Sequence, residues 1–114
     1  MKYTLFTPTY NRAHLLPALY ESMEVQAFKD FEWLVIDDGS KDNTEEVVNE
    51  LKLKASFPVR YIKQPNGGKH SAFNRAIEEA ISEWFVCIDS DDPLTSDAMT
   101  NMEKASQLVN DDAA

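Results

Sequence analysis

The sequence predicts an α/β fold in which a parallel sheet lies between layers of helices, an α/β/α sandwich. Four short apolar runs mark the expected strands, at residues 3–7, 33–36, 59–62 and 84–88. The second and fourth runs are continuously apolar, which is typical of strands covered on both faces. Because each run is followed by a segment with helical periodicity, the order predicts parallel strands joined by right-handed crossovers.

The expected helices are recognised by apolar residues three or four positions apart. Their markers are Leu15, Leu19 and Met23, then Val47, Val48 and Leu51, then Phe73, Ile77 and Ile81, and finally Met99, Met102 and Val109. Asp42 and Glu45 have the spacing of a capping box at the start of the second helix.

Length and composition are those of one globular domain. The chain has 114 residues, of which 43% are hydrophobic and 27% charged, which argues against a disordered chain. We place the domain at residues 1–110 and expect residues 111–114 to fray. Cys87 is the single cysteine, so an intrachain disulfide is excluded. The first residues lack the apolar stretch of a signal peptide or membrane span, which suggests a cytoplasmic location.

The formal net charge of −9 limits the partners of the chain. An acidic protein repels nucleic acid and anionic membranes, so we expect no nucleic-acid partner. An anionic small ligand would need a local feature that offsets this negative charge, such as a cation, a helix N-terminus or a well-placed Lys or Arg.

Polar residues follow each expected strand, where ligands of open parallel sheets bind. Tyr10 and Arg12 offer an aromatic face and a fork of donors, although a turn with a packed tyrosine is an alternative. Asp37 and Asp38 point to opposite sides of an extended chain, so one can face the crevice while the other caps a loop. Lys69 and the amides of its glycine-containing loop could meet an anion, or could form a solvated connection.

The most acidic segment follows the fourth run. Asp89, Asp91 and Asp92 lie within four residues, where carboxylates repel one another and resist burial. A divalent cation among them would offset this repulsion, and oxygen-only ligands suit Mg²⁺ or Mn²⁺. The alternative is acidity at the N-terminus of the following helix. We favour the metal, because the cluster follows an apolar strand at the expected ligand edge.

Together these residues describe a pocket for a nucleotide with a diphosphate. The ring N–H of a uracil-like base could donate to Asp38, and its face could stack on Tyr10. Asp89 could hold ribose hydroxyls. A metal held through Asp91 would bridge the diphosphate oxygens.

Four segments, in this order and spacing, resemble family 2 glycosyltransferases of the GT-A fold. They are residues 7–12 (TPTYNR), 35–40 (VIDDGS) with Asp42, 66–70 (NGGKH) with Asn74, and 88–92 (IDSDD). The resemblance implies a Rossmann-like nucleotide-diphospho-sugar transferase fold, with residues 1–110 as the donor-binding domain. It also implies a UDP- or GDP-linked sugar donor, with UDP favoured, a Mn²⁺ or Mg²⁺ ion, and a role in cell-wall or polysaccharide biosynthesis.

The resemblance assigns roles to individual residues. The implied nucleotide contacts are Pro8, Thr9, Tyr10, Arg12, Asp38, Lys69, Asp89 and Ser90, and the implied metal ligands are Asp91, Asp89 and Asp92. Asp91 belongs to the DxD signature, Lys69 is the expected diphosphate contact, and Asp92 is either a second metal contact or a helix cap.

Members of that family are much longer than this chain. Their acceptor site, for a saccharide or other hydroxyl compound, and the general base of inverting enzymes lie downstream of the DxD region. We therefore identify no catalytic residue here and interpret the chain as truncated or as an isolated donor-binding domain. Truncation would expose a surface with Trp33, Trp84 and the methionine-rich last helix, through which the chain could dimerise.

Two other functions stay open. One is a non-catalytic module that holds a nucleotide or a partner without transfer. The other is a receiver-like phosphotransfer domain, which also carries acidic residues, Mg²⁺ and a lysine. The acidic pair of receivers follows the first strand, whereas the first run here ends in residues 7–10 (TPTY).

Overall fold

The computed structural model describes the backbone of residues 2–113 and their side chains, except those of Lys69 and residues 109–113. The elements are β1 (Tyr3–Thr9), the 3-10 helix η1 (Ala13–Leu15), α1 (Leu16–Glu24), β2 (Phe31–Asp37), α2 (Thr44–Lys54), β3 (Val59–Lys63), α3 (Lys69–Glu79), β4 (Trp84–Cys87) and α4 (Ala98–Ala113). The predicted alternation of strands and helices is confirmed.

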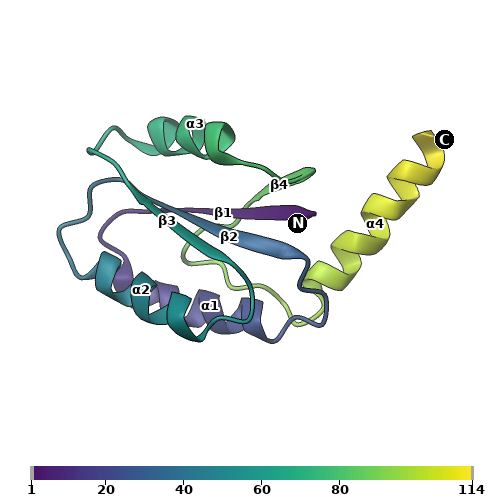
Figure 1. The fold of residues 1–114 in the computed structure, drawn as a ribbon, viewed down its shortest axis with the longest axis horizontal. Helices are drawn as coiled ribbons and strands as arrows, with labels where there is room; N and C mark the ends of the chain where they lie inside the picture. The colour runs from purple at the N-terminus through teal and green to yellow at the C-terminus, as the bar shows by residue number, and fades with distance from the viewer. Residues whose placement is uncertain (1, 114) are drawn as a thin grey trace.

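The sheet has the strand order β3-β2-β1-β4, and every pairing is parallel. Helices α1 and α2 cover one face and α3 covers the other, so the predicted α/β/α sandwich is confirmed (Figure 1). The carboxyl ends of all four strands therefore lie at the same edge of the sheet.

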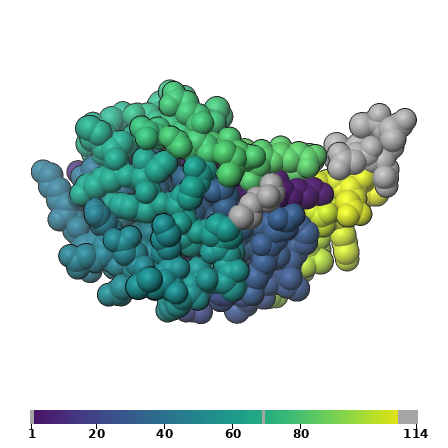
Figure 2. Space-filling model, in the orientation of Figure 1, coloured from purple at the N-terminus to yellow at the C-terminus, as the bar shows by residue number. Residues whose placement is uncertain are grey.

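Helix α4 extends away from the sandwich at one end of an elongated molecule (Figure 2). It is held near the start of β1, where the Tyr3 hydroxyl donates to the Glu103 carboxylate at 2.9 Å and to Ser106 Oγ at 3.0 Å. The predicted domain boundary after residue 110 falls inside this helix. The boundary stays a prediction, because the side chains of residues 109–113, including the expected helix marker Val109, are not described. Among the helices of the described part, none is long and apolar enough to cross a membrane.

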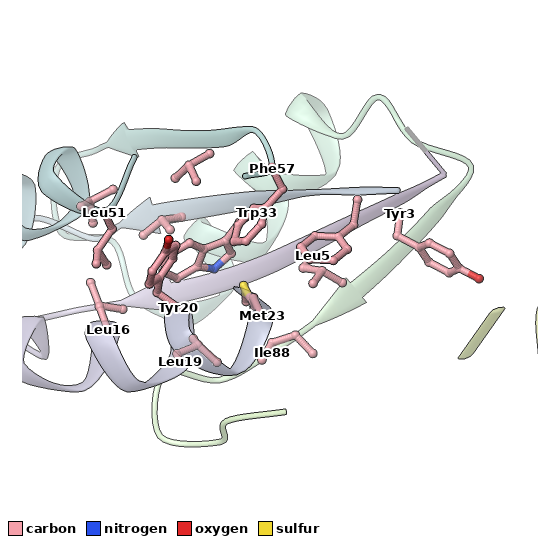
Figure 3. Close-up of a cluster of buried hydrophobic side chains, with 14 of the residues drawn as sticks. Tyr3, Leu5, Leu16, Leu19, Tyr20, Met23, Trp33, Leu51, Phe57 and Ile88 are labelled. Atoms are coloured by element: carbon pink, nitrogen blue, oxygen red, sulfur yellow. The ribbon is translucent and has the colours of Figure 1, made fainter. Parts of the chain in front are cut away.

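The main core lies between the sheet and the α1/α2 layer (Figure 3). Trp33 lies at its centre, fully buried, and its indole N–H donates to Thr7 Oγ1 at 2.9 Å. The prediction that Trp33 lies on an exposed surface is therefore wrong. The reason is that β2 is an interior strand, flanked by β1 and β3, and α1 covers the face on which Trp33 lies.

Helix α3 packs through a face that its sequence pattern did not indicate. Ala72 and Ala76 are buried against the sheet, whereas Phe73, Ile77 and Ile81 are 41%, 54% and 76% exposed. The helix was predicted correctly, but its buried face was not. Small side chains let the helix lie close to the sheet, and beside them the half-exposed Phe73 still packs edge-on against the rings of Phe6 and Phe85.

The start of α2 also differs from the prediction. The helix begins at Thr44, and the Asp42 carboxylate accepts hydrogen bonds from the backbone N–H groups of Thr44 and Ala13, both at 3.1 Å. The predicted capping box with Glu45 is therefore wrong. Asp42 instead joins the start of α2 to η1.

A buried ion pair fastens the α3 face of the sheet. Glu32, 2% exposed on the central strand β2, accepts a hydrogen bond from Arg60 Nε at 2.6 Å and one from Thr4 Oγ1 at 2.9 Å. Arg60 also donates to the carbonyl of Glu79 at the end of α3. The pair thus links three strands to a helix.

We predict that Glu32→Gln lowers the free energy of unfolding by about 2 kcal/mol, because Arg60 loses the closer and more deeply buried of its two charged partners and keeps only Glu79 at 3.6 Å. Urea unfolding followed by circular dichroism measures this change. Glu21→Gln is the matched control, since its pair with Lys54 is exposed and should contribute little. Equal shifts of the unfolding midpoint in the two variants would contradict the prediction.

Candidate functional site

A cavity of about 420 Å³ opens at the carboxyl edge of the sheet. It is lined by Pro8, Thr9, Tyr10, Arg12, Asp38, Ala72, Asp89, Ser90 and Asp91. Eight of these nine residues are candidate site residues from the sequence. The sequence-based prediction did not include Ala72. Its only sequence signal is a second alanine, Ala76, four residues later in the same helix. Lys69 is outside the described side chains, so its predicted contact stays a prediction.

The loop after β1 is fixed by Asn11, which the sequence analysis did not select. Asn11 has φ 53°, a left-handed conformation that asparagine tolerates better than most residues. Its side-chain oxygen accepts from the Lys41 N–H at 2.7 Å, and its own N–H donates to Ser40 Oγ at 2.8 Å. These bonds place the flanking Tyr10 and Arg12 against the loop that follows β2.

The two adjacent aspartates after β2 have different surroundings. Asp37 is fully buried and accepts hydrogen bonds from the Ser40 N–H at 2.8 Å and from the Tyr61 hydroxyl. Burial and the neighbouring Asp37 carboxylate raise the pKa of Tyr61 above its usual value. Asp38 lies beside the cavity. Asp37 thus closes the turn, while Asp38 lies where it can meet a ligand.

Asp38 also holds the loop between β3 and α3. Its carboxylate accepts from the N–H groups of Gly67 at 2.9 Å and Gly68 at 2.8 Å, and from Gln64 Nε2 at 3.1 Å. Burial alone would raise the pKa of Asp38, but these hydrogen bonds outweigh it and lower the pKa below its usual value. The loop amides that we expected to meet a ligand's anion are therefore engaged by a carboxylate of the protein itself.

Asp38 keeps capacity for one more donor. An ionised carboxylate has about four acceptor positions, and three are used here. Among the described groups, Gly68 alone donates to Oδ2, so the remaining position is on that oxygen. A ligand N–H could therefore bind without displacing the loop.

Gly39 brings the same loops into close contact. It has φ 81°, and a Cβ at this position would lie 2.9 Å from the backbone nitrogen of Asn66. A side chain would push the β2 and β3 loops apart. Gly39 is therefore needed both for the positive φ of the turn and for the close approach of Asn66.

Thr9 adds an unsatisfied group beside the cavity. It is 3% exposed, and its hydroxyl has no hydrogen-bond partner among the described residues. Buried hydroxyls in folded proteins are generally paired. A polar ligand in the cavity could supply the partner with a small rotation of this side chain.

The acidic segment, defined as residues 89–92, follows β4, which pairs with β1 on the side away from β2, and it contributes Asp89, Ser90 and Asp91 to the cavity lining. Asp89, Asp91 and Asp92 are exposed and Ser90 is buried, and the Asp92 N–H donates to the carbonyl of Asp89 at 3.1 Å. Because α4 begins only at Ala98, Asp92 is not its cap, which corrects one of the two alternatives for this residue.

The described residues contain no cluster of three or more His, Cys, Asp or Glu side chains that could hold a metal ion by themselves. Asp89 and Asp91 nevertheless line the cavity with carboxylate oxygens. Mg²⁺ commonly binds through one or two carboxylates and completes its shell with water and phosphate oxygens. The residues present therefore fit a cation that arrives with a phosphorylated ligand.

Comparison with known sequences and structures places this chain in a family. The sequence profile described as glycosyl transferase family 2 matches residues 4–111. The chain is 37% identical over 112 residues to GalNAc(5)-diNAcBac-PP-undecaprenol β-1,3-glucosyltransferase of Campylobacter jejuni. That match covers 93% of this chain and 35% of the relative, so this chain spans about a third of the relative's length.

Solved structures agree with the sequence comparison. The Staphylococcus aureus protein TarS, residues 1–349 in complex with UDP, matches with a TM-score of 0.83 and 26% identity over 97% of this chain and 32% of its own. A mannosyltransferase from Pyrobaculum calidifontis in complex with GDP-Man and Mn²⁺ matches with a TM-score of 0.83 and 26% identity, over 90% of this chain and 31% of its own. With a family profile matched over nearly its whole length and the GT-A architecture in its structure, the chain belongs to glycosyl transferase family 2.

Proposed function

We propose that this cavity binds a nucleoside diphosphate sugar together with Mn²⁺ or Mg²⁺, and that UDP is preferred over GDP. The observation that carries the proposal is that one cavity brings together an aromatic ring and carboxylates from three strand ends. Tyr10 and Asp38 come from the loops after β1 and β2, and Asp89 and Asp91 come from the segment after β4, which pairs with β1 on the side away from β2. A base and a metal-bound diphosphate need such a combination of groups.

The base would lie on the side of the β1 and β2 loops. Tyr10, 44% exposed, offers a ring for stacking, and Asp38 Oδ2 offers an acceptor for a ring N–H. Thr9 and Arg12 provide further polar groups, and Pro8 an apolar contact. The UDP held by TarS in its crystal structure supports this choice of base.

The ribose and diphosphate would lie toward the acidic segment. Asp89, with Ser90 beside it, would accept hydrogen bonds from ribose hydroxyls, and Asp91 would hold the cation, with Asp92 as a candidate second contact. Lys69, at the start of α3, is the side chain that we expect to contact the diphosphate. A divalent ion, when bound, would offset negative charge on the diphosphate as it departs.

We propose that the whole protein transfers the sugar to an acceptor hydroxyl. The acceptor oxygen would form the new bond to the anomeric carbon, and the bond to the diphosphate would break with its electron pair leaving on the nucleoside diphosphate. The residues of this chain would bind and orient the donor. The group that removes the acceptor's proton is not assigned to any of them.

Calorimetric titration of UDP and GDP, each with and without Mn²⁺, tests the donor site. We predict that UDP binds more tightly than GDP, that Mn²⁺ increases UDP affinity by at least about tenfold, and that Asp91→Asn removes this gain. Asp30→Asn is the matched control, because it makes the same charge change at the opposite edge of the sheet. Retention of the full Mn²⁺ effect in Asp91→Asn would refute the metal assignment.

The stacking role of Tyr10 has its own test. Tyr10→Ala should weaken binding of uridine, which has no phosphate, by about fivefold, because a stacked base contributes about 1 kcal/mol or more. Tyr10→Phe keeps the ring and should bind uridine as the wild type does. Fluorescence or calorimetric titration gives both affinities, and equal losses in the two variants would show that the hydroxyl rather than the ring matters.

Both proposed roles of Asp38, as base acceptor and as anchor of the β3–α3 loop, need the ionised carboxylate. Because its pKa is lowered in the folded protein, ionisation contributes stability that is complete above the ordinary Asp pKa of about 3.9 and is lost as the pH falls from there through the lowered value. We predict that wild type exceeds Asp38→Asn in unfolding free energy by a constant amount between about pH 5 and 8, and that the difference shrinks below about pH 4. Urea unfolding across this range measures it, and a difference that grows in acid would contradict the assignment.

A further inference from the structure

The acidic segment is held at both of its ends by groups outside the cavity. Before it, Ile88 is 8% exposed, packs into the main core and donates its N–H to the carbonyl of Phe6 at 2.7 Å. The chain therefore enters the segment from a fixed position. After the segment, the next regular element is α4, which begins only at Ala98. The second end of the segment therefore needs to be held by side chains.

Two side chains provide the second anchor, Ser22 in the last turn of α1 and Gln26 two residues after its end. Ser22 Oγ accepts a hydrogen bond from the Leu94 N–H at 3.0 Å, and Gln26 Nε2 donates to the carbonyl of Thr95 at 2.7 Å. Ser22 and Gln26 lie about 70 positions before their partners in the sequence. They fix the chain directly after the acidic segment.

Gln26 is fully used in this contact. It is 2% exposed, its amide nitrogen also donates to the carbonyl of Ser22 at 2.9 Å, and its oxygen accepts from the N–H of Met99 at 3.0 Å. Met99, the second residue of α4, is itself fully buried in the main core. A buried amide with its donors and acceptor all paired is rigid, and loss of it leaves backbone groups unsatisfied.

We infer that Gln26 and Ser22 are positioning residues for the acidic segment, an inference that rests on the proposed function. Asp89 and Asp91 repel each other and must nevertheless be presented together to a cation. Anchors on both sides of the segment oppose the spreading that this repulsion favours. The side chains that touch a ligand and those that hold the segment are therefore different.

The two halves of the cavity are positioned by separate networks. Tyr10 and Asp38 are held through Asn11, Ser40 and the β3–α3 loop. Among the described residues, Gln26 instead forms its hydrogen bonds with Ser22, Thr95 and Met99. Loss of Gln26 should consequently impair the metal half of the site and spare the base half. A residue with a general role in stability would affect both halves alike.

The experiment compares Gln26→Leu, Ser22→Ala and Ser22→Thr with the wild-type chain. Titrations with UDP, with and without Mn²⁺, and with uridine alone give the Mn²⁺-dependent gain and the base affinity separately. Gln26→Leu should lose about tenfold or more of the Mn²⁺-dependent gain, as supporting residues of metal sites do, with uridine affinity unchanged. Ser22→Ala should show a smaller loss, and Ser22→Thr, which keeps the hydroxyl, should restore the gain.

A metal-free readout and a control complete the design. Amide hydrogen exchange of Leu94 and Met99 should accelerate in the respective variants, because their acceptors are removed. Tyr3→Phe is the matched control, since it removes two hydrogen bonds that hold α4 far from the acidic segment, and it should keep the full Mn²⁺ gain.

The outcomes separate this inference from the proposed function. If the wild type shows no Mn²⁺-dependent gain, the proposed function fails and the inference falls with it. If the wild type shows the gain and the folded Gln26→Leu and Ser22→Ala variants keep it, only the inference is overturned. A parallel loss of uridine affinity in Gln26→Leu overturns it as well, because Gln26 would then support the whole fold.

Discussion

The hydrogen bonds between the Asp38 carboxylate and the amides of Gly67 and Gly68 are the constraint on which the candidate site depends. They join loops that lie 29 and 30 positions apart in the chain. Burial opposes a charged carboxylate, and three donors offset that cost, with the net result that its pKa is lowered. Since Gly39 allows the same loops to approach closely, the part of the cavity beside Asp38 is shaped by contacts within the protein.

The acidic segment is organised differently. The carboxylates of Asp89 and Asp91 are exposed beside the cavity, and their backbone is held from outside by Ile88 before them and by the side chains of Ser22 and Gln26 after them. In a chain with a formal net charge of −9, a diphosphate on this side would be repelled unless a cation came with it. One cavity therefore combines a buried carboxylate held by loop amides with two exposed carboxylates.

The parallel sheet explains why local motifs were enough to locate the site. Each motif follows a strand, and parallel pairing brings every strand end to one edge, so Tyr10, Asp38 and Asp89 could be placed together from their order alone. The face of α3 could not be predicted in the same way. Helical periodicity identified an apolar stripe through Phe73 and Ile77, but the side chains buried most deeply against the sheet are the alanines beside it, and Phe73 meets the sheet while still partly exposed.

The sequence by itself determined the alternation of strands and helices, the family, and the kinds of side chain at each strand end, because these depend on neighbouring residues and on local periodicity. Only the tertiary structure decided that Asp38 rather than Asp37 lies beside the cavity, that the glycine amides are engaged by Asp38, and that Gln26 holds the chain after the acidic segment. These contacts join residues that are far apart in the chain. Their partners follow from packing of the whole domain, which no local pattern specifies.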